Sequence, residues 1–470
     1  MIGAMSDASG DTAVWPAVRL AQAIRDKDLS SRELLDLYLE RIDRLNGPVN
    51  AVVTLDADRA RTAADEADAA TARGESSGPL HGLPITIKDA IEVEGVRSTG
   101  GAVELTDHVP ASDAVAVAKL KDAGAVVFGK TNVPRWSGDL QTYNEIFGTT
   151  NNPWDTSRGP GGSSGGAASA VTCGFTSFEV GTDIGGSVRF PSHFCGTFGL
   201  KPSFGVIPQR GYLDQVGGGI TDADINVFGP IARSAADLEL LLDVLAGPPP
   251  EQAPAWRLSL PEPRGASLAD YRIGVWFEDP RCTIDSEYLS ILRSTVDALS
   301  AAGAKIEEAH PAVSFTEQVD LFNTMITAAI APSMGPELGA AIGGSHYDWL
   351  QRERERVGFK QAWADWFTSY DVLLCPVSPT PPFPHNQTEE FFTRTMQVNG
   401  EERSYLDNVC WTGLIGIVGL PSAVPPLEKT SSGLPVGVQV VTPYLRDRDA
   451  VRVAGLIAEV TGGYVTPPGF

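Results

Sequence analysis

The chain has 470 residues, 42% of them hydrophobic and 20% charged, which is typical of a globular protein with a large core. Its formal net charge of -23 argues against a nucleic-acid partner, because phosphates would be repelled. The five cysteines form no CxxC pair and the six histidines no HExxH pair, which indicates a reducing cytoplasm and no metal or other cofactor.

Residues 1–15 lack the basic start and apolar run of a signal peptide. No apolar run is long enough to span a membrane, so we expect no membrane partner.

Hydrophobic periodicity predicts strands and helices in alternation along the chain. Strands are predicted over residues 49–55, 83–88, 125–129, 178–181, 271–277, 305–308, 372–375, 420–424 and 436–441. Helices are predicted over 15–46 (two helices, the second opened by a capping box at 30–33), 58–73, 114–123, 167–173, after 229–234, 286–302, most of 315–356 and 449–460. The alternation indicates an α/β protein, and it continues beyond a proline-rich connection at 248–263.

Two serines framed by glycines mark a candidate site. Ser163 lies in the sequence GGSSGG (161–166) and Ser187 in GTDIGGS (181–187), 24 positions later. Glycine allows unusual backbone angles and the close approach of another group, so both serines are well placed to meet a ligand. A serine hydroxyl is a poor nucleophile until a base accepts its proton.

Two kinds of residue could act as the general base for these serines. His193 follows Ser187 by six residues and would give a histidine triad, but no GxSxG elbow is present and we favour a core histidine. The other candidate is a lysine kept neutral by burial. Lys88 ends an apolar strand pattern, although a lysine at a strand end is more often solvated and spacing alone does not select it.

A series of motifs over residues 82–245 resembles the amidase signature family. The motifs are GLPITIKD (82–89), GKTN (129–132), GTTNNP (148–153), GGSSGG (161–166), GTDIGGS (181–187), FGLKP (198–202) and GPIAR (229–233). The resemblance implies a single large α/β domain, with a central mixed multi-stranded β-sheet covered by helices on both sides. Its parts would be an N-terminal helical part (1–75), the signature core (76–245) and a remainder with the substrate loops (264–470).

The resemblance also implies a Ser-Ser-Lys triad. Ser187 matches the acyl-accepting nucleophile, Lys88 the general base, and Ser163 a bridging serine that the family holds through a cis peptide bond. The oxyanion hole would be formed by the backbone N–H groups of Ile184, Gly185, Gly186 and Ser187.

Four further residues are interpreted as supporting groups. Ser164 competes with Ser163 for the bridging role, but the family's spacing to the nucleophile favours Ser163. Thr182 is expected to make local hydrogen bonds only. Asp183 and Arg189 flank the nucleophile loop and would brace it, with or without pairing to each other.

Substrate specificity lies outside the shared motifs, in loops rich in aromatic residues and glycine. These suit a hydrophobic acyl or aryl group, although each aromatic side chain could equally pack its own loop. The candidate pocket residues are Trp136, Leu140, Gln141, Tyr212, Gln215, Phe383, Asn399 and Trp411.

Within the family, a soluble bacterial-type amidase for small aryl or alkyl amides fits best, with carbamate hydrolysis (a urethanase) as the main alternative. An esterase-like side activity and a catalytically silent binding protein are further alternatives. The A component of the tRNA-linked amidotransferases is disfavoured, because Phe190 stands where its pattern usually has glutamine. A fatty-acid-amide type is disfavoured because no N-terminal membrane helix is evident. We expect a monomer or homodimer.

Overall fold

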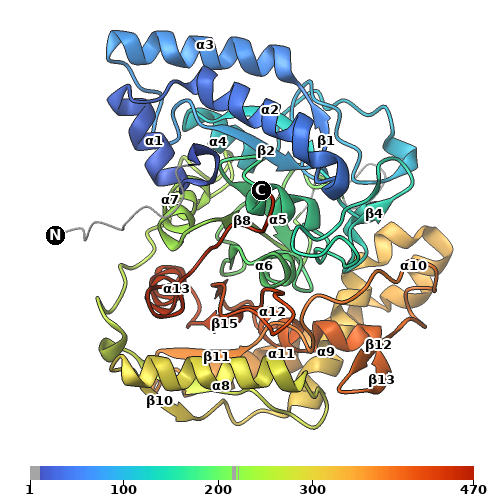
Figure 1. Cartoon of the computed structure of the whole chain (residues 1–470). Helices are drawn as coiled ribbons and strands as arrows, with labels where there is room; N and C mark the ends of the chain where they lie inside the picture. The colour runs from blue at the N-terminus through green and yellow to red at the C-terminus, as the bar shows by residue number, and fades with distance from the viewer. Residues whose placement is uncertain (1–10, 214–218, 221) are drawn as a thin grey trace.

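A mixed eight-stranded sheet forms the centre of the molecule in a computed structural model, which describes residues 11–213, 219–220 and 222–470 (Figure 1). Strands β9, β10 and β11 are parallel to one another and the remaining pairings are antiparallel. The strand order is β10 (Lys305–Glu308), β9 (Arg272–Val275), β11 (Val372–Pro376), β15 (Val438–Val441), β14 (Ser422–Val424), β7 (Phe198–Lys201), β8 (Val227–Ala232) and β6 (Glu179–Asp183).

A smaller sheet adjoins the β6 edge of the large one. Its order is β1 (Val52–Leu55), β3 (Val126–Thr131) and β2 (Pro84–Lys88), with β2 parallel to β3 and β1 antiparallel to it. Strand β2 lies beside β6, and the Thr86 hydroxyl donates a hydrogen bond to Glu179 across the junction at 2.7 Å. The end of β2 is thereby held next to the end of β6.

Helices cover both faces of the large sheet. Helices α5 (Gly165–Thr172) and α6 (Arg189–Cys195) pack on the face to which Ile231 of β8 points. Phe228 and Ala232 of the same strand belong to the larger core with α7 (Ala235–Leu245) and α13 (Asp447–Thr461). Because side chains alternate along a strand, these are opposite faces.

The other helices surround these layers (Figure 1). They are α1 (Ala17–Asp26), α2 (Ser31–Val49), α3 (Ala57–Arg73), α4 (Val115–Asp122), α8 (Ser286–Ala301), α9 (Phe315–Ile330), α10 (Pro336–Gly343), α11 (His346–Trp366) and α12 (Cys410–Gly416). Two short hairpins are β4 (Tyr143–Asn144) with β5 (Gly148–Thr149) and β12 (Thr395–Val398) with β13 (Glu401–Ser404). Helix α2 begins with the predicted capping box, in which Ser30 and Glu33 each accept the other's backbone N–H.

The predicted elements are present with small shifts of their ends, except that α11 continues beyond the predicted end at residue 356 to Trp366, and several unpredicted elements join them. Sequence patterns did not indicate α6, α12, the β12–β13 hairpin or the central strands β7 and β8. Within the described ranges, none of the helices is both long and apolar enough to cross a membrane.

Candidate active site

Lys88 lies at the end of β2 with its side chain fully buried. Its Nζ is 2.7 Å from Ser163 Oγ, 3.0 Å from Ser164 Oγ and 2.7 Å from Thr182 Oγ1. Burial lowers the pKa of the Lys88 ammonium to about 7, against the opposing charges of Asp183 and Glu179. A large fraction of Lys88 is therefore a neutral amine near neutral pH.

The Ser163 segment is held closely against the neighbouring chain. The Gly162–Ser163 peptide bond is cis, which confirms this part of the family resemblance. A methyl group at Gly162 would lie 2.6 Å from the Asp139 carbonyl oxygen, so only glycine fits there. Ser164 then donates its backbone N–H to the carbonyl oxygen of Ser187 at 3.2 Å, which joins the two serine segments.

The loop carrying Ser187 is shaped by a buried ion pair. Arg189 Nη2 lies 2.8 Å from Asp183 Oδ1, and both side chains are fully buried. Asp183 also accepts the backbone N–H groups of Gly186, Val188 and Arg189. Burial alone would raise the Asp183 pKa, but the charge and hydrogen bonds of Arg189 lower it to about 2. Asp183 is thus ionised, and with Arg189 it braces the loop.

Ser187 is 6% exposed, more than Ser163 at 1%, as a group that meets substrate should be. Among the predicted oxyanion donors, the Gly186 N–H is already directed at Asp183 Oδ1, at 2.8 Å. Within the part of the chain that the structure describes, the N–H groups of Ile184, Gly185 and Ser187 donate to no protein acceptor. These three remain as candidate oxyanion donors.

Thr182 does more than the sequence indicated. Its hydroxyl accepts the Lys88 hydrogen bond and lies 3.4 Å from the Tyr212 hydroxyl, to which it donates. Thr182 therefore orients the amine toward the serines. The motif contains this threonine, but only the packing of β2 against β6 shows that it faces Lys88.

His193 is a structural residue. It is fully buried on α6, where Nδ1 accepts the Gly437 N–H at 2.8 Å and Nε2 lies 3.1 Å from the Thr380 carbonyl oxygen. Burial lowers its pKa to about 4. Both ring nitrogens are engaged by backbone groups rather than by a serine and a carboxylate, so the structure does not form the alternative histidine triad.

The predicted pocket residues divide into several groups. Leu140 and Phe383 pack in an aromatic cluster with Phe190, Phe194 and Tyr405. Tyr212 contacts Thr182, whereas Gln141 holds the backbone of Asn386 through both ends of its amide.

Trp136 is partly exposed, at the turn after β3, and its backbone N–H donates to the Gly100 carbonyl oxygen. Gln215 lies outside the described residues.

Two of the predicted pocket residues have structural positions instead. Asn399 accepts the Ser286 N–H and donates to the Ile284 carbonyl oxygen, which fastens the β12–β13 turn to the start of α8. Trp411 is fully buried in a cluster with Trp276 and Phe315. Aromatic and amide side chains in loops are as suited to structural contacts as to ligand binding. Here Trp411 packs in the core and Asn399 makes hydrogen bonds to the backbone.

An apolar wall that sequence reasoning missed stands over the nucleophile loop. A methyl group at Gly185 would lie 3.5 Å from Ile326, 3.6 Å from Val409 and 3.7 Å from Phe322. Two of these residues come from α9, whose apolar periodicity was visible but could equally indicate a core helix. Across the described residues, no cluster of histidine, cysteine or acidic side chains is arranged to hold a metal ion.

Comparison with known proteins bears on this site. The family model described as Amidase matches residues 33–337 and 315–451. The chain belongs to the amidase family. Its site and membership agree with an enzyme that acts on an amide-type C–N bond.

Curated relatives of this chain are named as components of a tRNA-linked amidotransferase and not as amidases for small amides. The A component of a glutamyl-tRNA(Gln) amidotransferase from Moorella thermoacetica is 33% identical, covering 90% of this chain and 92% of that protein. The protein of the same name from a Roseiflexus species is 31% identical, covering 95% of this chain and 96% of that protein. These relatives therefore do not support the argument from Phe190 against the amidotransferase subclass.

Solved structures agree in fold. One solved structure, described as a vestigial protein complex that reveals the origins of an s-triazine catabolic enzyme, contains a chain 26% identical to this one. The two superpose with a TM-score of 0.83, covering 96% of this chain and 100% of the other. A bacterial aryl acylamidase of the amidase signature family, 24% identical, reaches a TM-score of 0.83 over 95% and 96% of the two chains. The second likeness supports the fold alone.

Proposed function

We propose that this amidase-family chain hydrolyses carboxamides through an acyl-enzyme on Ser187, with small aryl or alkyl amides as substrates. Carbamates offer the same carbonyl group and are the alternative substrates. The observation that carries the proposal is Lys88, a fully buried amine with its pKa lowered to about 7, at 2.7 Å from Ser163 Oγ.

The proposed proton path combines the Lys88–Ser163 contact with the nucleophile role that the family resemblance implies for Ser187. Ser187 Oγ attacks the substrate carbonyl carbon and passes its proton to Ser163, while Ser163 passes its own to neutral Lys88. When the C–N bond breaks, the proton returns from Lys88 through Ser163 to the leaving nitrogen. Water then attacks the acyl-enzyme by the same path and releases the acid and free Ser187.

The nucleophile loop would stabilise the charge that develops on the carbonyl oxygen. The N–H groups of Ile184, Gly185 and Ser187 have no acceptor among the described residues and could donate to substrate, and the Asp183–Arg189 pair fixes the loop before substrate arrives. Losing one such donor typically lowers kcat by about 10²–10³.

The preference for apolar substrates rests on the wall beside Gly185. Ile326, Val409 and Phe322 would contact any group that reaches the loop from this side. These side chains offer no charged partner to a polar amino acid such as glutamine. The aromatic cluster around Phe190 and Phe383 lies close behind the Ser163 segment and extends the apolar surroundings.

The A component of the tRNA-linked amidotransferase is the second candidate function, because curated relatives at 33% and 31% identity bear that name. It would use glutamine as its amide and would need partner proteins, whereas we propose that this chain acts as a monomer or homodimer. The purified chain should be assayed on an acetanilide, a primary alkyl amide, a dicarbamate, a p-nitrophenyl ester and glutamine. Turnover of glutamine alone would favour the amidotransferase.

A serine-directed probe tests the proposed nucleophile. A fluorophosphonate should label the wild-type chain and not Ser187→Ala, and kcat of that variant should fall by at least about 10⁴. Ser192→Ala is the matched control, because Ser192 is buried on α6 and its hydroxyl has no partner among the described residues. Labelling that persists in Ser187→Ala contradicts the assignment, and no labelling of the wild type would favour a silent binding protein.

A further inference from the structure

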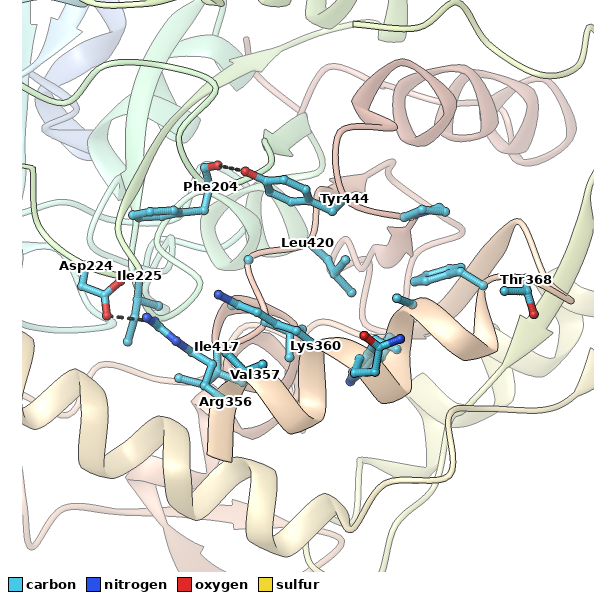
Figure 2. Close-up of a pocket in the computed structure, with 18 of the residues that line it drawn as sticks. Phe204, Asp224, Ile225, Arg356, Val357, Lys360, Thr368, Ile417, Leu420 and Tyr444 are labelled. Atoms are coloured by element: carbon cyan, nitrogen blue, oxygen red, sulfur yellow. Dashed lines mark hydrogen bonds and ion pairs between the residues drawn. The ribbon is translucent and has the colours of Figure 1, made fainter. Parts of the chain in front are cut away.

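A cavity of about 640 Å³ lies between α11 and the loops that follow β7, α12 and β15 (Figure 2). Small-molecule sites typically enclose about 300–1,000 Å³. Its described lining includes none of the catalytic candidates Lys88, Ser163 and Ser187. The cavity thus lies outside the catalytic residues but adjoins the nucleophile loop, because a methyl group at the lining residue Gly416 would lie 3.6 Å from the Ile184 carbonyl oxygen.

Apolar side chains form most of the cavity walls. Phe204 and Tyr444 lie side by side on one wall, where the Tyr444 hydroxyl donates to the Phe204 carbonyl oxygen at 2.9 Å. Val357 on α11 and Leu420 after α12 lie across from them (Figure 2). A ring or alkyl chain of a ligand would be desolvated between these walls.

Two cationic side chains of α11 bring donors to the same space. Arg356 is 8% exposed and pairs with Asp224 at 2.8 Å and with Glu353 on its own helix, but its Nε is buried without a hydrogen-bond partner among the described residues. Among the residues that the structure describes, Lys360 Nζ makes one ion pair, a long one of 3.9 Å to Glu353. In Figure 2 the Lys360 ammonium lies between Arg356 and Phe204.

The charges of this corner are balanced, because Arg356 and Lys360 face the carboxylates of Asp224 and Glu353, so the open feature is an unused donor and not an excess of positive charge. Burial and the neighbouring charge of Arg356 lower the pKa of the Lys360 ammonium, while the carboxylates of Glu353 and Asp224 partly oppose this decrease. Asp224 supplies the one carboxylate among the described lining residues, and it is already paired with Arg356. A buried donor without a partner is costly, so an acceptor from a ligand would stabilise this arrangement.

We propose that this cavity is a second, non-catalytic binding site for a small amphipathic carboxylate. Its carboxylate would accept hydrogen bonds from Arg356 and Lys360, and its aromatic or alkyl part would lie against Phe204 and Tyr444. Charge-assisted hydrogen bonds of this kind supply orientation, and the apolar walls supply most of the affinity.

Calorimetric titration with 4-phenylbutyrate tests the site, with 4-phenylbutanol as the uncharged analogue. The acid should bind the wild-type chain, and the alcohol should bind at least about tenfold more weakly. Lys360→Met should weaken binding of the acid about tenfold. Ala364→Trp, at an exposed lining position, should fill the mouth and abolish binding.

Lys305→Met is the matched control, because Lys305 is exposed on β10 and donates to the Ala269 carbonyl oxygen away from the cavity. It should bind the acid as the wild type does, and all three variants should keep wild-type hydrolytic activity and melting temperature. The proposal is overturned if the wild type does not bind, if acid and alcohol bind equally, or if Lys360→Met and Ala364→Trp leave binding unchanged.

Discussion

Lys88 can act as a base only because the fold removes it from water while keeping acidic groups nearby. Burial lowers its pKa to about 7, and Asp183 and Glu179 prevent a larger decrease. Burial likewise raises the pKa of Glu179 to about 7. The motif makes Lys88 a candidate, but its burial and its three hydroxyl partners follow from the packing of the small sheet against the large one and could not be derived from spacing.

The proton requirement sets the expected pH dependence. Neutral Lys88 is the active form, so kcat/KM should rise with pH through about 7 and then level off. The ionised Glu179 favours the Lys88 ammonium, so Glu179→Gln should lower the Lys88 pKa and move this rise to lower pH.

The pH profile of kcat/KM for the wild type and Glu179→Gln provides the measurement. Glu308→Gln, at an exposed position on the far edge strand β10, should leave the profile unchanged. A rise that stays in place or moves to higher pH in Glu179→Gln would show that Glu179 does not act on the base.

Among the elements, β8 shows why sequence patterns miss some central strands. It contains Gly229 and Pro230, residues that usually argue against a strand interior, and the prediction therefore placed only a helix after them. In the structure a methyl group at Gly229 would lie 2.0 Å from the Leu200 carbonyl oxygen of β7, so the close approach of two strands requires glycine. By contrast, β2 and β3 were predicted because continuous apolar residues mark strands buried on both faces.

Substitution at this position should destabilise the fold. Gly229→Ala forces β7 and β8 apart, and we expect the free energy of unfolding to fall by at least about 1–3 kcal/mol, the usual cost of overpacking. Gly358→Ala on α11 is the matched control, because a methyl group there meets nothing within 4 Å. It should be neutral or stabilising by about 0.5–1 kcal/mol, since alanine favours the helix.

Denaturant unfolding of both variants gives the comparison. Equal stability of Gly229→Ala and the wild type would mean that the strands separate without cost.

At the scale of the whole molecule, charge bears on whether the chain by itself binds nucleic acid. With 59 acidic and 36 basic residues, the chain carries a formal net charge of -23 and should repel a nucleic-acid backbone. The purified chain should therefore cause no mobility shift of tRNA even at about 20 mM salt, where phosphate contacts are strongest. Added tRNA should also leave its rate of amide hydrolysis unchanged. A shift that disappears as salt is raised would reveal a basic surface strong enough to overcome the net charge, and would favour the amidotransferase that the named relatives suggest.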